Sequence, residues 1–81
     1  MKLTYDPRYN IAYLQLHEKT DQVQVETIRV SDELNVDIAP DGTVYGIELL
    51  NANVHLGAED QGKLVVINEA LGNRQEITLV R

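Results

Sequence analysis

The sequence of 81 residues contains no cysteine, phenylalanine or tryptophan. Without cysteine, no disulfide can stabilise the fold and no thiolate can hold a metal ion. The length indicates a single domain over residues 1–81, and a domain this small can bury only a limited part of its surface. Its core must therefore come from packing of valine, isoleucine and leucine alone, or be completed by a second subunit or a partner.

Basic residues are also scarce. Seven lysines and arginines stand against thirteen aspartates and glutamates, so the formal net charge is −6. No two basic residues are adjacent, so the chain lacks the basic stripe with which proteins neutralise phosphates, and we expect no direct binding to nucleic acid. An acidic surface can simply keep a small domain soluble, or it can favour a basic protein partner.

Long apolar runs are missing as well. The longest is the stretch LVVI at residues 64–67, which is far shorter than a membrane span. The N-terminus has no leader of charged, then apolar, then small residues, so no signal peptide is expected. These absences predict a cytoplasmic protein without a membrane partner.

What the sequence does contain is a series of short apolar segments with the two-residue period of β-strands. They predict a mainly β fold, a small antiparallel sheet of about six strands built from hairpins, with at most one short helical turn. The expected strands cover residues 2–5, 10–16, 23–30, 34–38, 44–50, 64–67 and 76–80. In the third of these, the apolar phase changes at Glu26 and Thr27, which predicts a β-bulge there. Val54 and Leu56 mark one further short strand candidate within the polar segment 51–62.

The connection between the last two strands contains Gly72 and Asn73. A two-residue loop at these positions would set Glu69 opposite Glu76, and like charges directly opposite are unfavourable. We therefore expect a longer loop, of about one helical turn, capped by Asn68.

Residues 37–50, DIAPDGTVYGIELL, form a turn flanked by apolar segments. Pro40, Asp41 and Gly42 suit a type I turn in which Gly42 takes the left-handed conformation and forms a bulge. The rival arrangement is a two-residue loop of Asp41 and Gly42, which leaves Pro40 at a paired position without an N–H group to donate. We favour the first arrangement.

The apolar residues after this turn are out of phase with those before it, so a second irregularity is needed. One extra residue at Tyr45 and Gly46, opposite Asp37, brings Val36 opposite Ile47 and places the apolar residues of both strands on one face. Glycine inside a strand often marks such a bulge. Asp41, Gly42 and Gly46 are therefore assigned structural roles in the turn and the bulge.

Two segments, TYDPRYNIAYLQL and VSDELNVDIAPDGTVYGIELLNA, resemble the small bacterial proteins of domain of unknown function 2283, over about residues 2–52. Asn10 departs from the family pattern where an acid is frequent, and Tyr45 departs where valine is frequent. The resemblance implies a small β-rich fold without established chemistry, and antitoxin-like binding of a partner. The matching residues are Tyr5, Asp6, Tyr13, Asp37, Asp41, Gly42, Gly46, Ile47, Glu48 and Leu50.

Few side chains could carry chemistry. His17 and His55 are isolated in the sequence, whereas a zinc site needs three or four ligands, so we expect no metal site and no cofactor. Asp37 and Glu48 can point to the same side of the hairpin, where a carboxylate pair could act as acid and base. Such a pair is also typical of a solvated sheet face. One hypothesis is therefore a small metal-binding or carboxylate-dependent enzyme that uses Asp37, Glu48 and a histidine.

The hypothesis that we favour is a non-catalytic protein-interaction domain. It would bind a partner in an antitoxin-like manner, or a second copy as a homodimer, through a sheet face or edge. Apolar residues on both faces of the strand at 10–16 and the lack of a catalytic constellation favour it. On or beside the hairpin, Asp37, Tyr45 and Glu48 are the predicted contacts with a partner.

Overall fold

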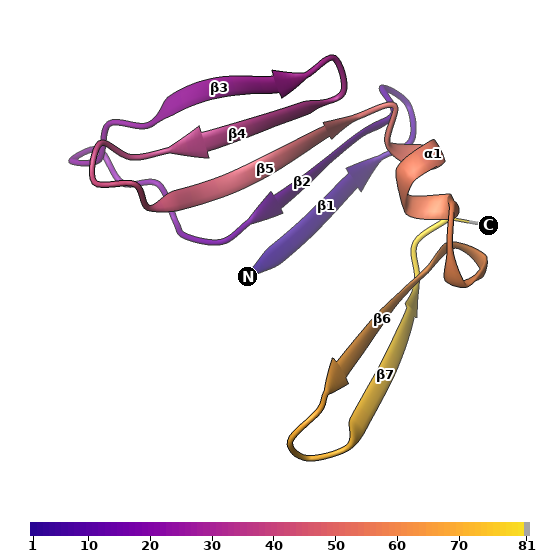
Figure 1. Cartoon of the computed structure of the whole chain (residues 1–81). Helices are drawn as coiled ribbons and strands as arrows, with labels where there is room; N and C mark the ends of the chain where they lie inside the picture. The colour runs from indigo at the N-terminus through magenta and orange to yellow at the C-terminus, as the bar shows by residue number, and fades with distance from the viewer. Residues whose placement is uncertain (81) are drawn as a thin grey trace.

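The computed structural model, which describes residues 1–80, confirms the mainly β fold (Figure 1). Five antiparallel strands form one sheet in the order β1-β2-β5-β4-β3. A short helix and a 3₁₀ turn then lead to a separate two-stranded hairpin. The elements are β1 (Lys2–Asp6), β2 (Ile11–Gln15), β3 (Glu26–Ser31), β4 (Leu34–Ile38), β5 (Val44–Leu50), α1 (Ala52–Gly57), η1 (Asp60–Gly62), β6 (Lys63–Asn68) and β7 (Asn73–Thr78).

The sheet has one aliphatic face, which we call the apolar face. Because directly paired residues of antiparallel strands point the same way, the pairings place a row of aliphatic side chains across all five strands. That row is Leu3, Leu14, Ile47, Val36 and Ile28. A second row beside it contains Tyr5, Ala12, Leu49 and Leu34.

The opposite face is polar over the centre of the sheet. Tyr13, Glu48 and Asn35 occupy successive positions of one row. Gly46, Asp37 and Thr27 occupy the next row. Alternation along the strands therefore separates an apolar face from a face that carries hydroxyl, amide and carboxylate groups.

The β4–β5 hairpin has the predicted turn and the predicted bulge. Ala39 N–H donates to Thr43 O at 2.9 Å, Gly42 N–H donates to Ala39 O at 2.9 Å, and Gly42 has a φ of 92°. Asp37 pairs with Gly46, whereas Ile38 pairs with Val44, so Tyr45 is the extra residue. The alternative two-residue loop of Asp41 and Gly42 is wrong, because Val44 could not then pair with Ile38 as it does in the structure.

The third strand differs from the prediction. β3 begins at Glu26, and its irregularity lies between Arg29 and Ser31 rather than at Glu26 and Thr27. Glu26 already pairs with Ile38, the last residue of β4. Residues 23–25 precede the strand because β4 has ended there and offers them no partner.

Residues 52–57 form a helix and not the short strand suggested by Val54 and Leu56. Asn51, with a φ of 53°, turns the chain out of the sheet immediately after β5. Ala52 N–H donates to Asn10 O at 3.0 Å and is fully buried, which anchors the first turn of α1. Val54 is 55% exposed, so its side chain adds little to the packing of α1.

The last hairpin has the longer loop that charge repulsion predicts. Asn68 pairs with Asn73, and Glu76 lies opposite Val65 and not opposite Glu69. Asn68 Oδ1 accepts from the backbone N–H groups of Ala70 and Leu71, both at 3.1 Å. The loop therefore closes as a single turn capped by the Asn68 side chain.

Packing inside the chain is thin. Among the residues the structure describes, the buried apolar ones are Ala12, Ala39 and Ala52, and no valine, isoleucine or leucine is buried. Within residues 1–80, no helix is long and apolar enough to cross a membrane. Figure 1 shows the β6–β7 hairpin projecting from α1, clear of the five-stranded sheet. The described part of the chain therefore leaves its main apolar surface without a covering layer.

Candidate functional site

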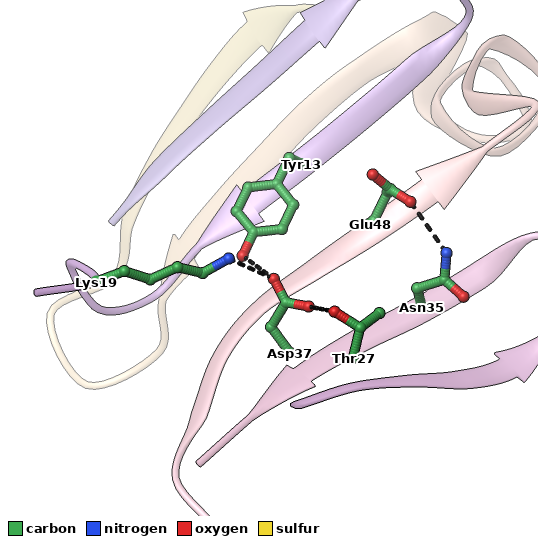
Figure 2. Close-up of polar contacts among 6 residues, drawn as sticks. All are labelled: Tyr13, Lys19, Thr27, Asn35, Asp37 and Glu48. Atoms are coloured by element: carbon green, nitrogen blue, oxygen red, sulfur yellow. Dashed lines mark hydrogen bonds and ion pairs between the residues drawn. The ribbon is translucent and has the colours of Figure 1, made fainter. Parts of the chain in front are cut away.

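The polar face carries one well-connected cluster, centred on Asp37 of β4 (Figure 2). Tyr13 Oη and Lys19 Nζ both donate to Asp37 Oδ2, at 2.8 and 2.6 Å. Thr27 Oγ1 donates to Asp37 Oδ1 at 2.6 Å. We call these four residues the Asp37 cluster. Through a single carboxylate, it joins the strands β2, β3 and β4 and the segment that follows β2.

The Asp37 cluster shifts the ionisation of its members. Burial, with only 12% of the side chain exposed, would raise the pKa of Asp37. The bonds from Lys19, Thr27 and Tyr13 outweigh burial and hold that pKa below its ordinary value. Conversely, burial and the bond to Asp37 raise the pKa of Tyr13, and the bond to Asp37 raises that of Lys19. The cluster therefore favours an ionised Asp37, a neutral Tyr13 and a charged Lys19.

Gly46 has a second role beside the bulge. A Cβ atom added at Gly46 would collide with Oη and Cζ of Tyr13, so the phenol ring occupies the space where a side chain would stand. Lys19 Nζ lies 5.4 Å from the centroid of the same ring, within the range of cation–π attraction. Gly46 thus lets Tyr13 lie across β5 and reach Asp37.

The other two predicted contact residues lie apart from the Asp37 cluster. Glu48 shares the polar face and accepts from Asn35 Nδ2 at 3.0 Å. Tyr45 packs against His17 instead, with ring centroids 5.4 Å apart and planes tilted by 56°. The predicted partner contacts at Asp37, Tyr45 and Glu48 stay a prediction. Asp37 already accepts three bonds from within the chain.

Neither histidine joins the two carboxylates. His55 Nε2 lies 3.3 Å from Glu33 Oε1, and His17 packs against Tyr45. The polar partners of Asp37 and Glu48 described above include no histidine. In the part of the chain that the structure describes, no three histidine or acidic side chains are grouped as ligands for a metal ion.

The family described as "Protein of unknown function (DUF2283)" matches residues 2–53. The chain belongs to the DUF2283 family. A Bacillus subtilis (strain 168) relative, "Uncharacterized protein YuzE", is 36% identical over 63 residues, covering 75% of this chain and 49% of the relative. The chain thus spans about half the length of the curated relative it matches. No solved structure is a significant match.

The DUF2283 match coincides with the five-stranded sheet and the start of α1, and it ends before β6 and β7. Several family-pattern residues have structural tasks here. Asp6 accepts from the Arg8 backbone N–H at 2.9 Å, as expected of an aspartate before a proline turn. Asp41 Oδ1 accepts from the Thr43 N–H at 2.9 Å inside the β4–β5 turn. Residues of the DUF2283 pattern thus form turns and a cross-strand cluster in this chain.

Sequence reasoning missed three members of the Asp37 cluster. Tyr13 was marked by the DUF2283 pattern, but without a partner. Thr27 pairs directly with Asp37, a relationship hidden by the bulge predicted at Glu26 and Thr27. Lys19 lies in an irregular segment, and no sequence period indicates where such a side chain points.

Proposed function

We propose that this DUF2283 chain is a non-catalytic protein-interaction domain whose apolar face binds a protein. The observation that carries the proposal is the central row of that face. Leu14, Ile47 and Val36 lie on the three inner strands, yet none is buried. Inner strands of a sheet normally pack against a second layer, because that is how their aliphatic side chains leave water.

The total exposed surface supports an unfilled interface. The chain exposes 6294 Å² of surface, whereas a compact monomer of its 9.1 kDa mass would expose about 4,900 Å². Its radius of gyration is 14.3 Å, compared with about 12 Å for a compact domain of this length. The excess surface of roughly 1,400 Å² exceeds the ~800 Å² that each partner buries in a typical stable interface.

The polar face supports a structural role instead. The Asp37 cluster satisfies its hydrogen bonds within the chain, and Glu48 is paired with Asn35. The interaction is therefore proposed on the opposite face, either with another protein in an antitoxin-like pair or with a second copy. A cytoplasmic location, with neither nucleic acid nor membrane as partner, is part of the proposal and agrees with the absence of cysteine and of a basic stripe.

Substitution of two neighbouring residues tests the proposal. Val36→Lys places a charge at the centre of the apolar face, whereas Asn35→Lys places it on the polar face, beside Glu48. In light scattering and in co-purification from native cells, Val36→Lys should lose the bound protein or copy and Asn35→Lys should keep it. Ile28→Lys, at a 44%-exposed edge position, gives a milder second variant if Val36→Lys does not fold. A wild-type monomer without a stoichiometric partner, or equal binding by both lysine variants, would refute the proposal.

A further inference from the structure

The β6–β7 hairpin, which we call the arm, leaves an apolar side of its own exposed. Leu64 pairs with Ile77 and Val66 pairs with Gln75, so these four side chains point the same way. Leu64, Val66 and Ile77 are 38%, 47% and 51% exposed. The arm therefore presents an aliphatic strip to solvent.

The charged side chains of the arm lie on its other side. Glu76 Oε1 lies 2.9 Å from Arg74 Nη2, and Glu76 Oε2 lies 3.6 Å from Lys63 Nζ. All three residues belong to the register positions that alternate with Leu64, Val66 and Ile77. The strip and the apolar face of the sheet can therefore meet without desolvating these ion pairs.

Within residues 1–80 of one chain, no second layer covers either surface. An isolated two-stranded hairpin is only marginally stable in water and needs a third element to pack against. Figure 1 shows the arm pointing away from its own sheet, and β6 and β7 hydrogen-bond as a sheet of their own. The chain thus contains two apolar surfaces, the apolar face of the sheet and the strip on the arm, and keeps them apart.

We propose that the apolar face is covered by the arm of a second copy, so that two chains exchange arms in a closed dimer. This inference rests on the proposed function and names its partner. A two-fold exchange covers both faces and both arms at once, and it closes without leaving a free surface for further growth. Stacking the two sheets directly would cover the faces but would leave both arms in water.

The charge distribution agrees with a second copy despite its net charge of −6. Among the described strand residues, the pairings place one acid on the apolar face, Glu26 at the β3 edge. The centre of the face is aliphatic, and the strip on the arm is aliphatic with Gln75 beside it. Like charges of the two copies therefore stay outside the contact, where salt screens them.

Disulfide cross-linking tests the exchange, because the natural chain has no cysteine to interfere. A Val66→Cys chain is mixed with a chain that carries cysteine at Leu14, Ile47 or Val36, and the mixture is oxidised. We expect a covalent heterodimer with at least one of the three, and light scattering of the wild type should give twice 9.1 kDa. Asn35→Cys, next to Val36 but on the polar face, should give no heterodimer with Val66→Cys.

Other outcomes would overturn the exchange in distinguishable ways. An internal disulfide in a monomeric chain that carries both Val36→Cys and Val66→Cys would show that the arm folds onto its own sheet. Val36→Cys chains that link to each other, while Val66→Cys chains do not link to any sheet position, would show direct stacking of sheets. A monomer that binds a different protein through Val36 would overturn the exchange and leave the proposed function intact. A monomer whose apolar face binds nothing would overturn both.

Discussion

The phenol ring of Tyr13 lies over Gly46, in the space that any side chain at residue 46 would occupy. This relationship separates two features of β5 that coincide in sequence. The bulge arises because Tyr45 is an extra residue in the pairing with β4. The glycine next to it is required by a side chain from β2, which passes across it to reach Asp37. A family pattern containing this glycine therefore reports a cross-strand contact as well as a bulge.

Replacing Gly46 by alanine should destabilise the fold by about 1–3 kcal/mol, the range for overpacking a fitted site. The new Cβ displaces the Tyr13 ring, and the ring cannot move without stretching its bond to Asp37. Urea denaturation of Gly46→Ala, Tyr13→Leu and the double variant measures the coupling. Because Tyr13→Leu removes the phenol that Gly46→Ala strikes, the double variant should be more stable than the sum of the two losses predicts.

Gly42→Ala is the matched control for this cycle. It should also lower stability, because Gly42 has a φ of 92° that alanine adopts with strain. A Cβ atom at Gly42 meets no atom within 4 Å, so its effect should be additive with that of Tyr13→Leu. Equal coupling of both glycines to Tyr13 would contradict the assignment of Gly46 to a steric role.

Asp37 should make stability depend on pH in the acid range. Its pKa is held below the ordinary value in the fold, so the folded state binds a proton at Asp37 less readily than the unfolded state does. The resulting stability is present above about pH 4, the ordinary aspartate pKa, and is lost as the pH falls below it toward the folded pKa. Asp37→Asn should therefore be less stable than the wild type at pH 7, by about 1–3 kcal/mol. Its stability should also change less than that of the wild type between about pH 5 and about pH 3, a range that brackets the ordinary aspartate pKa.

Urea midpoints across this pH range provide the measurement. The loss of stability on acidification should be reduced in Asp37→Asn but not abolished. The pKa of Asp6 is also lowered, by Arg8, and the pKa of Asp41 is lowered by Thr43. Lys19→Met should have a much smaller effect at pH 7 than Asp37→Asn, since the lysine side chain is 48% exposed and water screens its ion pair. If the two variants lose the same stability, the ion pair and not the hydroxyl bonds dominates the cluster.

Asn10 should be a stabilising residue of the junction between the sheet and α1. Its Nδ2 donates to Asn51 Oδ1 at 3.2 Å and to Asn53 Oδ1 at 2.6 Å, and its Oδ1 accepts from Asn53 N–H at 2.7 Å. Asn10→Ala should cost about 1–2 kcal/mol, because it loses these bonds and keeps a φ of 56° that alanine disfavours.

Asn10→Gly separates the two contributions, because glycine accepts the positive φ and lacks the side chain. It should lie between the wild type and Asn10→Ala in thermal stability. Hydrogen exchange at the Asn53 amide should rise in both variants, because both lose its acceptor, Oδ1 of Asn10. The Ala52 amide should change less, since its acceptor is the backbone carbonyl of residue 10, which both variants keep. Unchanged protection at the Asn53 amide in Asn10→Ala would show that α1 is held by other contacts.

The sequence predicts the parts of this fold that depend on local pattern. The turn at Gly42 and the extra residue at Tyr45 follow from the position of Val44, because only the bulged register places it on the same face as Ile38 and Ile47. The helix at 52–57 does not follow, since it depends on a left-handed Asn51 and a bond to Asn10 from a distant turn.

The Asp37 cluster and the uncovered apolar face cannot be predicted from the pattern of residues in the sequence. Asp37 attracts notice as a polar residue in an apolar strand, but its three donors come from segments whose relative placement requires the tertiary structure. Alternation predicts that Val36 and Ile47 face the same way. It does not reveal whether another element packs against them. The arm would have the same pattern of apolar residues if it covered the sheet of its own chain.

Gly62 should be required for the hydrogen bonds that close the base of the arm. Its carbonyl accepts from the N–H groups of Leu79 and Val80, both at 3.0 Å, where the chain leaves β7. Gly62 has a φ of 75°, and a Cβ atom there would collide with the Val80 carbonyl oxygen, a backbone atom that cannot rotate away. Gly62→Ala should therefore break both bonds and cost at least about 1–2 kcal/mol.

Gly57→Ala is the control, because a Cβ atom at Gly57 would make ordinary contacts with the Val80 side chain, the nearest at 3.7 Å. Hydrogen exchange at Leu79 and Val80 should accelerate in Gly62→Ala and stay near the wild-type rate in Gly57→Ala. Exchange at Ile47 and Leu49 should change less than at Leu79, because the sheet pairs independently of the arm within one chain. If the Leu79 amide keeps its protection in Gly62→Ala, the base of the arm is held by contacts other than the Gly62 carbonyl.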